Sequence, residues 1–182
     1  MNIIPTHIPD VLIIEPQVFG DERGFFMETW NQQRFAEQGL TMSFVQDNHS
    51  RSAQGILRGL HYQIHKPQGK LVRVTSGCVY DVAVDIRRDS PTFGQWAGVE
   101  LSAENHRLFW VPEGFAHGFY VMSESADFQY KCTELYAPEH ERCIRWDDPA
   151  LNIDWPLVNG EPPRLSAKDA EGKSLQDAEV FA

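Results

Sequence analysis

Residues 71–86 have the sequence LVRVTSGCVYDVAVDI, in which two apolar runs flank the dipeptide Ser76-Gly77. Valine is frequent in both runs, and a Ser-Gly dipeptide between such runs is typical of a turn that joins two strands. Short runs of this kind, separated by turn residues and without helices between them, continue from about residue 57 to residue 136. The pattern predicts an all-β fold, an antiparallel β-sandwich or barrel.

Further strands are expected on both sides of this hairpin. They are residues 43–50, 57–63, 95–101, 108–111, 117–122 and 126–136. From about residue 137 the chain is irregular and rich in proline, and we expect Trp146, Trp155 and Leu157 to anchor it.

The N-terminal part of the chain predicts two more strands and one short helix. Residues 11–15 are expected to form an edge strand, because Pro16 ends it and cannot donate to a ladder. Residues 25–30 follow as a second strand after a turn at 20–24. Residues 31–38 are the expected helix, with Asn31 as its N-cap and Gly39 as its C-terminal stop.

The strand expected at 79–86 has an unusual alternation of residue types. Its even positions are apolar, whereas its odd positions include Asp81 and Asp85. A buried carboxylate needs a partner, so Asp81 can face an internal cavity and orient a histidine. Alternatively, both acids lie on a solvated face of the sheet. The sequence leaves these two interpretations open.

Composition narrows the class of protein. The 182 residues predict one domain over 1–182, and a net charge of −10 argues against a nucleic-acid partner. No apolar run approaches the roughly 20 residues that span a bilayer, and the N-terminus has no signal-peptide pattern. Cys78, Cys132 and Cys143 show no CxxC spacing, which predicts reduced thiols in a cytoplasmic protein, with neither a disulfide framework nor a zinc site.

The segments LRGLHYQ (57–63) and QGKLV (68–72) bring together a base, His61, and two cations, Arg58 and Lys70. Such groups can remove a proton beside a carbonyl while they hold an anionic substrate. The alternative is a half-buried strand with one histidine and some surface charge. A regular strand would place Arg58 and His61 on opposite faces, so a shared site requires an irregularity, for which Gly59 is a plausible position for a bulge.

Six motifs, which follow one another from about residue 9 to residue 171, resemble the dTDP-4-dehydrorhamnose 3,5-epimerase family. They are GDERGFF (20–26), QDNHS (46–50), LRGLH (57–61), QGKLV (68–72), VPEGFAHGF (111–119) and LSAKD (165–169). The resemblance implies a cupin-type jelly roll with a few short helices. It also implies a homodimer to which the N-terminal strands contribute, and a cofactor-free epimerase in dTDP-L-rhamnose biosynthesis.

The chemistry of such a reaction fits these residues. A 4-keto sugar has acidified C–H bonds at C3 and C5, and inversion needs a base, an opposed proton donor and a cation at the enolate oxygen. The resemblance makes His61 the base, Asp169 its acidic partner, Tyr130 the proton donor and Lys70 the group that stabilises the enolate. Without the resemblance, Tyr130 would be an ordinary core aromatic residue and Lys70 a solvated lysine.

The resemblance also implies residues that bind the nucleotide sugar. They are Arg23, Glu28, Gln46, Asp47, Asn48, Arg58, Lys70, His117, Glu141 and Lys168. Arginine can clamp a diphosphate bidentately, and an arginine as early as Arg23 fits N-terminal strands lent to the partner's site. His117 is expected in the wall of the site, paired with Asp81, and not as a second base.

Three alternatives remain at this point. A metal-dependent cupin is disfavoured, because His61-Tyr62-Gln63 replaces one expected histidine ligand by an amide and Lys70 would repel a cation. A relative that inverts a single carbon can use the same base and tyrosine. A silent sugar-binding cupin would not need an opposed base and acid. We therefore expect no metal and no cofactor.

Overall fold

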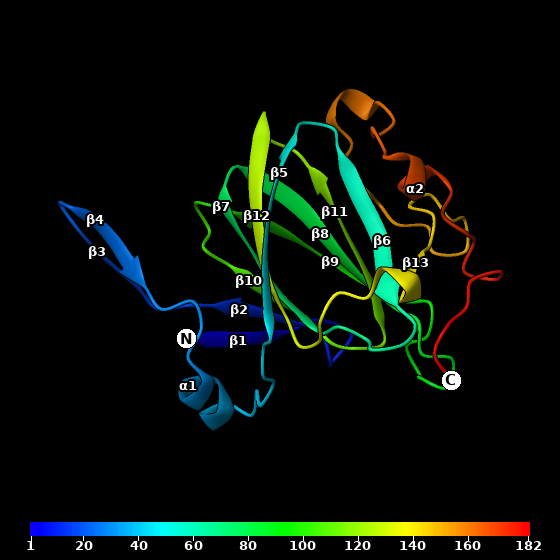
Figure 1. Cartoon of the computed structure of the whole chain (residues 1–182). Coiled ribbons are helices and arrows are strands. Elements are labelled where there is room, and N and C mark those ends of the chain that lie inside the picture. Colours follow the sequence, from blue (N-terminus) through cyan, green and yellow to red (C-terminus); the bar gives the residue numbers. More distant parts are fainter.

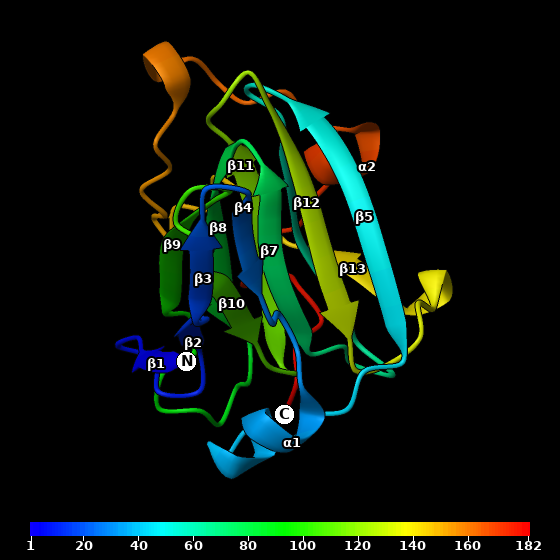
Figure 2. The same cartoon turned by 90° about the vertical axis from the view of Figure 1, so that its left-hand side faces the viewer.

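The computed structural model describes residues 1–182 as two facing β-sheets, a separate hairpin and two short helices (Figures 1 and 2). In spatial order the first sheet contains β1 (Asn2–Pro5), β2 (Leu12–Glu15), β10 (Leu108–Val111), β7 (Lys70–Ser76), β12 (Ser125–Cys132) and β5 (Gln46–Ala53). The second sheet contains β13 (Glu141–Cys143), β6 (Leu57–Gln63), β11 (Phe115–Val121), β8 (Cys78–Asp85) and β9 (Trp96–Ser102). The hairpin is formed by β3 (Val18–Asp21) and β4 (Gly24–Met27), and the helices are α1 (Gln32–Glu37) and α2 (Ala167–Ala170).

Every strand pair is antiparallel, and from β5 to β8 the chain alternates between the two sheets. Strands distant in sequence therefore become neighbours, as β10 does with β2 and β12 with β5. This is the jelly-roll arrangement, and the predicted all-β fold is confirmed. No helix in the chain is both long enough and apolar enough to cross a membrane.

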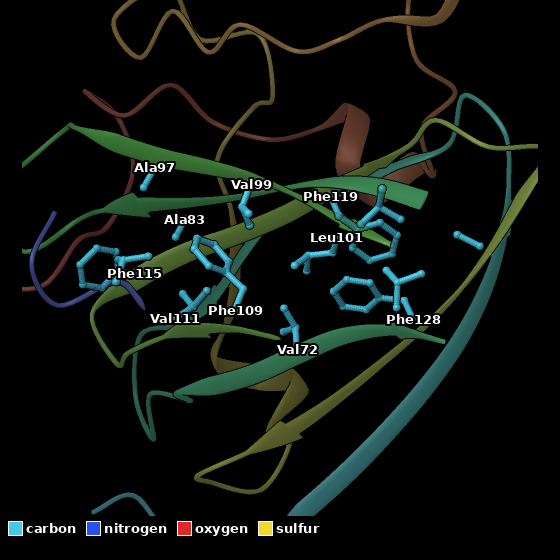
Figure 3. Packing of buried hydrophobic residues seen from close by; sticks show 14 of the residues in the cluster. Val72, Ala83, Ala97, Val99, Leu101, Phe109, Val111, Phe115, Phe119 and Phe128 are labelled. Atoms are coloured by element: carbon cyan, nitrogen blue, oxygen red, sulfur yellow. The ribbon is translucent and has the colours of Figure 1, made fainter. Parts of the chain in front are cut away.

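The main core lies between the two sheets. Figure 3 shows Val72, Phe109 and Phe128 from the first sheet packed against Val99 and Phe119 from the second. The rings of Phe119 and Phe128 stack with their centroids 4.1 Å apart. This contact joins the sheets next to the polar end of the sandwich, where the candidate site begins.

A second core explains the alternation in β8. Val79 and Ala83 face the core between the sheets, whereas Val82 and Val84 pack under the C-terminal segment with Trp155. Both faces of β8 are therefore covered, and neither Asp81 nor Asp85 is exposed to solvent. The interpretation of these acids as a solvated face is wrong, because they share the face of Val79 and Ala83, which the first sheet covers.

The N-terminal predictions are correct in part. The helix, its Asn31 cap and the turn of the β3–β4 hairpin are confirmed. The strand expected at 11–15 is confirmed as β2, but its predicted edge position is wrong, because β2 lies between β10 and β1, and β1 is the edge. The sequence analysis missed β1, which has only Ile3 and Ile4 as its apolar signal before Pro5. Among the other strands, β4 ends at Met27 and β12 at Cys132, each earlier than expected.

The β3–β4 hairpin projects away from both sheets (Figure 1). Its rings are largely exposed, with 61% for Phe19, 61% for Phe25 and 69% for Phe26. Three exposed aromatic side chains on one small element are unusual for a surface that meets only water.

A bulge in β6 turns two side chains towards the same cavity. His61 pairs with His117 and Arg58 pairs with Phe119, so two residues of β6 lie opposite Gly118 alone. The extra residue reverses the alternation, and Arg58 and His61 both line one pocket. The irregularity expected at Gly59 is confirmed.

We expect replacement of Gly59 by alanine to destroy this geometry. Gly59 has a φ of +128°, and a Cβ there would lie 2.5 Å from the Cα of Gly118 and 2.7 Å from the carbonyl oxygen of His117. Such a clash with backbone should lower the free energy of unfolding by about 2–4 kcal/mol, measured by urea denaturation. Gly160→Ala is the matched control, because Gly160 also has a positive φ but open space around it, and it should cost only about 1 kcal/mol. Equal losses in the two variants would contradict the role of close packing.

The carboxylate of Asp85 holds the end of β8 and the following turn. It accepts hydrogen bonds from Arg87 Nε at 3.0 Å, Ser90 Oγ at 2.6 Å and Thr92 Oγ1 at 2.6 Å. Burial alone would raise the pKa of Asp85, but these hydrogen bonds outweigh burial and lower the pKa to about 2. The ionised form therefore stabilises the folded state.

Asp85→Asn should consequently destabilise the protein in a pH-dependent way. The pKa of Asp85 is lower in the folded protein than in the unfolded chain, where it is about 4. The ionised carboxylate therefore stabilises the folded state fully at pH values above about 4, and this stabilisation disappears as the pH falls towards 2. We expect a loss of about 2 kcal/mol at pH 7 and about half of that at pH 3, measured by urea denaturation at both values. Asp147→Asn, which breaks an exposed pair with Arg145, should cost less than about 1 kcal/mol. A pH-independent loss in Asp85→Asn would contradict the argument.

Candidate active site

A polar pocket opens between the facing sheets, beyond the stacked rings of Phe119 and Phe128. The first sheet and the second both supply side chains to its walls, and the C-terminal segment supplies part of its rim. The lining residues are Gln46, Asn48, Ser50, Arg58, His61, Gln68, Lys70, His117, Phe119, Phe128, Tyr130, Tyr136, Glu141 and Lys168.

His61 on β6 is hydrogen-bonded through its Nε2 to the carboxylate of Asp169. Asp169 lies in α2, whose N-cap Ser166 donates its hydroxyl to the other carboxylate oxygen at 2.8 Å. Burial would raise the pKa of Asp169, but the hydrogen bonds and charge of His61 and the bond from Ser166 lower it. The carboxylate is thus ionised and fixed, and it holds the imidazole through Nε2, which leaves the other ring nitrogen, Nδ1, without a hydrogen bond.

Tyr130 and Lys70 lie on the facing sheet, on the adjacent strands β12 and β7. Burial raises the pKa of Tyr130, so its hydroxyl stays protonated and can donate a proton. Burial lowers the pKa of Lys70, and the negative charges of Glu141 and Asp81 oppose that effect. The pocket therefore has a histidine–carboxylate pair on one wall, with a phenol and an amine on the other.

His117 forms a second histidine–carboxylate pair behind the pocket. Its Nε2 lies 2.9 Å from Asp81 Oδ1 and 3.0 Å from Oδ2, and both side chains are buried. Burial raises the pKa of Asp81, while the imidazole of His117 and the charge of Lys70 oppose it. This is the histidine-orienting role that the alternation in β8 predicts for Asp81.

Charged groups also line the rim. Glu141 accepts a hydrogen bond from Lys168 Nζ at 2.8 Å and another from the Tyr136 hydroxyl at 2.9 Å. Burial would raise the pKa of Glu141, but these two bonds outweigh it and lower the pKa. Arg58 donates its Nε to Ser52 Oγ at 2.9 Å, which fixes the guanidinium against the pocket wall.

Most of the site residues predicted from the sequence line this pocket, but four do not. Asp169 lies next to the lining, hydrogen-bonded to His61, and the other three lie elsewhere. Arg23 is at the turn of the hairpin, with its side chain 85% exposed and paired with Asp21. Glu28 is bound by Asn31 and Arg34 next to α1. Asp47 is paired with Lys131 and lies on the other side of β5 from Gln46, Asn48 and Ser50.

The sequence analysis missed five pocket residues. They are Ser50, Gln68, Phe119, Phe128 and Tyr136. The alternation of β5 signals Ser50, which follows Gln46 and Asn48 with a period of two. The motif QGKLV contains Gln68, but nothing local marks Tyr136, which reaches the pocket only because the chain turns back after β12.

Gln63, which stands where a metal cupin would have a histidine, is a buried structural amide. Its Nε2 donates to the carbonyl oxygen of Lys66 at 2.8 Å, and its Oε1 accepts from the backbone of Ala137 at 2.8 Å. Gln63 therefore ties two loops together, and both polar atoms of its amide are already hydrogen-bonded.

Comparison with known proteins identifies the family. A model described as dTDP-4-dehydrorhamnose 3,5-epimerase matches residues 5–177. The dTDP-4-dehydrorhamnose 3,5-epimerase of Pseudomonas aeruginosa is 65% identical over 175 residues, which are 96% of this chain and 96% of that protein.

Solved structures agree with this assignment. The crystal structure of the dTDP-6-deoxy-D-glucose-3,5-epimerase of Legionella pneumophila in complex with dTDP-4-keto-L-rhamnose has a TM-score of 0.94 and 60% identity, and the alignment covers 98% of this chain and 94% of that one. A 3'-monoepimerase from Streptomyces bikiniensis in complex with dTDP-quinovose has a TM-score of 0.87 and 32% identity, with 94% and 87% covered.

The sequence motifs, the jelly roll and these matches over almost the whole length lead to one conclusion, that this chain belongs to the dTDP-4-dehydrorhamnose 3,5-epimerase family.

Proposed function

We propose that the protein epimerises C3 and C5 of dTDP-4-dehydro-6-deoxy-D-glucose, yielding dTDP-4-dehydro-L-rhamnose for dTDP-L-rhamnose biosynthesis, without a cofactor. The observation that carries the proposal is a single pocket with two facing walls. His61, hydrogen-bonded to Asp169, is on one wall, and Tyr130 and Lys70 are on the other. A base facing a proton donor across a cavity is the arrangement that inversion of a carbon centre requires. The family membership supports the same reaction.

In this mechanism His61 removes the proton from the carbon next to the C4 ketone. Asp169 stabilises the imidazolium that forms, because its carboxylate is ionised and hydrogen-bonded to the ring. The negative charge moves to the C4 oxygen, where the ammonium of Lys70 stabilises the enolate in a desolvated pocket. Tyr130 then delivers a proton to the opposite face of the carbon.

Substrate binding is assigned to the remaining polar side chains of the pocket. Arg58 and Lys168 provide positive charge for the diphosphate, and Gln46 and Asn48 provide amides. Glu141 holds Lys168 in place, and His117 with Asp81 forms a rigid wall behind Lys70. Asp47 is bound to Lys131 on the other side of β5, so we assign it no direct contact with substrate bound in its own chain.

We also propose a homodimer in which the β3–β4 hairpin reaches the partner's pocket. The hairpin projects from its own chain (Figure 1). Its three phenylalanine rings are exposed, and Arg23 at its turn does not line the pocket of its own chain. A partner that covers these rings would remove apolar surface from water and would place Arg23, with Glu28 behind it, at a second active site. The three unpaired cysteines support a cytoplasmic location, where thiols stay reduced.

The proposed reaction is tested by NMR of dTDP-4-keto-6-deoxyglucose in D2O with purified protein and a chelator. We expect deuterium at both C3 and C5, and a product that can be reduced to dTDP-L-rhamnose. Deuterium at one carbon would instead support a single-carbon epimerase, which the likeness to the 3'-monoepimerase makes the second candidate. Activity that depends on added divalent metal would overturn the cofactor-free mechanism.

His61→Asn should abolish turnover while nucleotide-sugar affinity stays almost unchanged. Loss of a general base removes roughly 10²- to 10⁴-fold in rate, whereas an amide of similar size preserves the pocket. Turnover is measured by NMR and dTDP affinity by calorimetry. His7→Asn, at an exposed loop position, is the control and should be fully active. Retained turnover in His61→Asn would rule out this residue as the base.

Mixed dimers test the exchange of hairpins. Chains carrying His61→Asn and Arg23→Ala are co-expressed with different tags, and the heterodimer is isolated. If Arg23 acts in the partner's site, one of the two sites contains both native residues, and we expect about half of the wild-type turnover, although each homodimer is defective. Loss of a charged contact to phosphate should weaken binding by roughly 10- to 100-fold in the Arg23→Ala homodimer.

The reciprocal pair provides the control. A doubly substituted chain, with both changes, is combined with the wild-type chain. Exchange of hairpins predicts that neither site of this heterodimer is intact, whereas action within one chain predicts about half activity. That second result, or a monomer in solution, would overturn the proposed dimer without affecting the role of His61.

A further inference from the structure

Cys143 lies beside the histidine–carboxylate pair and has no part in the reaction described above. It is directly opposite His61 in the β13–β6 ladder, so the two side chains are on the same face of the sheet. The helix α2 packs on β6 and brings Asp169 to the same place. One potential ligand atom from each of His61, Cys143 and Asp169 lies within 4.8 Å of the others.

These three donors form a recognisable ligand set. An imidazole nitrogen, a thiolate and a carboxylate suit zinc and cadmium, whereas magnesium and calcium prefer oxygen ligands alone. Ligand atoms of a tetrahedral zinc site are roughly 3 to 4 Å apart, so small side-chain rotations would bring this cluster to the required geometry. Because the three residues are far apart in sequence, spacing rules for cysteine and histidine motifs do not detect the cluster.

Nothing in the structure competes for the sulfur atom. Cys143 is partly exposed, unpaired, and bonded only to the carbonyl oxygen of its neighbour Ile144 at 3.5 Å. Burial and the charge of Asp169 raise the pKa of Cys143 to about 12, so the thiol is protonated when no cation is present. Binding of a cation would release this thiol proton to solvent, whereas the single ring proton of neutral His61 would move from Nε2, where it faces Asp169, to Nδ1.

We propose that His61, Cys143 and Asp169 form an inhibitory site for a borderline-soft divalent cation such as Zn²⁺ or Cd²⁺. The cation takes the Nε2 atom of His61 that Asp169 holds in the active protein. With Nε2 bound to the cation, the neutral ring carries its proton on Nδ1, and Nδ1 therefore has no lone pair with which to accept a proton from the substrate. Binding of the cation depends only on the His61–Cys143–Asp169 cluster, whereas inhibition of the enzyme also depends on the proposed function of His61.

Binding is measured first, without substrate. The full chain, treated with chelator and reductant and then desalted, is titrated with Cd²⁺, and the ultraviolet charge-transfer band of a cadmium–thiolate bond is recorded; calorimetry with Zn²⁺ gives the affinity. We expect one equivalent to bind. Cys143→Ser should lose the band and weaken Zn²⁺ binding by at least roughly tenfold, the loss that even an outer partner of a metal ligand typically causes. Cys78→Ser, at another partly exposed cysteine, is the matched control and should keep both the charge-transfer band and the Zn²⁺ affinity of the wild type.

Inhibition is measured next, by solvent deuterium exchange into the substrate. Zn²⁺ should inhibit the wild-type and Cys78→Ser proteins, and chelator should restore their activity. Cys143→Ser should be active without metal and should need at least roughly tenfold more Zn²⁺ for half inhibition. Absence of the band in the wild type, or equal inhibition of Cys143→Ser, would overturn the site. If the protein had no epimerase activity, the band and the calorimetry would still decide whether the cluster binds metal.

Discussion

The close approach of Gly59 on β6 to Gly118 on β11 is the constraint on which the site depends. The space between these strands admits no Cβ at Gly59, and the extra residue there changes the direction of every side chain that follows in β6. Arg58 and His61 consequently line the same pocket, whereas a regular strand would point one of the two side chains to the opposite face of the sheet. The same bulge leaves His61 opposite Cys143 and within reach of α2. A local irregularity of backbone thus selects which chemical groups meet, while the regular ladders on either side keep them in place.

The second requirement is a cover for the outer face of the second sheet. Val82 and Val84 of β8 need apolar partners there, and the C-terminal segment supplies Trp155 and Leu151. Because that segment must follow the sheet to bury its own side chains, it also carries Ser166 and Asp169 to the back of His61. The same segment therefore buries the outer face of the second sheet and positions Asp169 next to His61. The carboxylate of Asp169, to which we assign the role of partner to the base, is held by the segment that covers the hydrophobic core.

Features that depend on neighbouring residues can be predicted from the sequence, and features that depend on distant segments cannot. Alternation and turns depend on neighbouring residues, so the strands, the helix capped by Asn31 and the bulge at Gly59 could be predicted. The edge position of β1 and the burial of Asp85 could not, because both depend on segments that arrive from elsewhere in the chain. Tyr130 and Lys70 are ordinary residues in their local context, and only the motif order singled them out. The grouping of Cys143 with His61 and Asp169 lies beyond any local pattern, since three separate elements create it.

Charge in the pocket resolves an apparent conflict with the composition. The chain has a net charge of −10, yet a nucleotide sugar is itself an anion. In the pocket, the acids Asp81, Glu141 and Asp169 are each bonded to a cation or an imidazole, which leaves Arg58 and Lys70 without an acidic partner at bonding distance. The local field is therefore attractive although the surface as a whole is not. In the proposed mechanism one base and one proton donor serve two carbons, so the hydrogen that is removed depends on how the sugar ring is turned. We therefore infer that lining side chains which can orient the ring, such as His117 in the wall and Tyr136 at the rim, bear on the choice between one inversion and two.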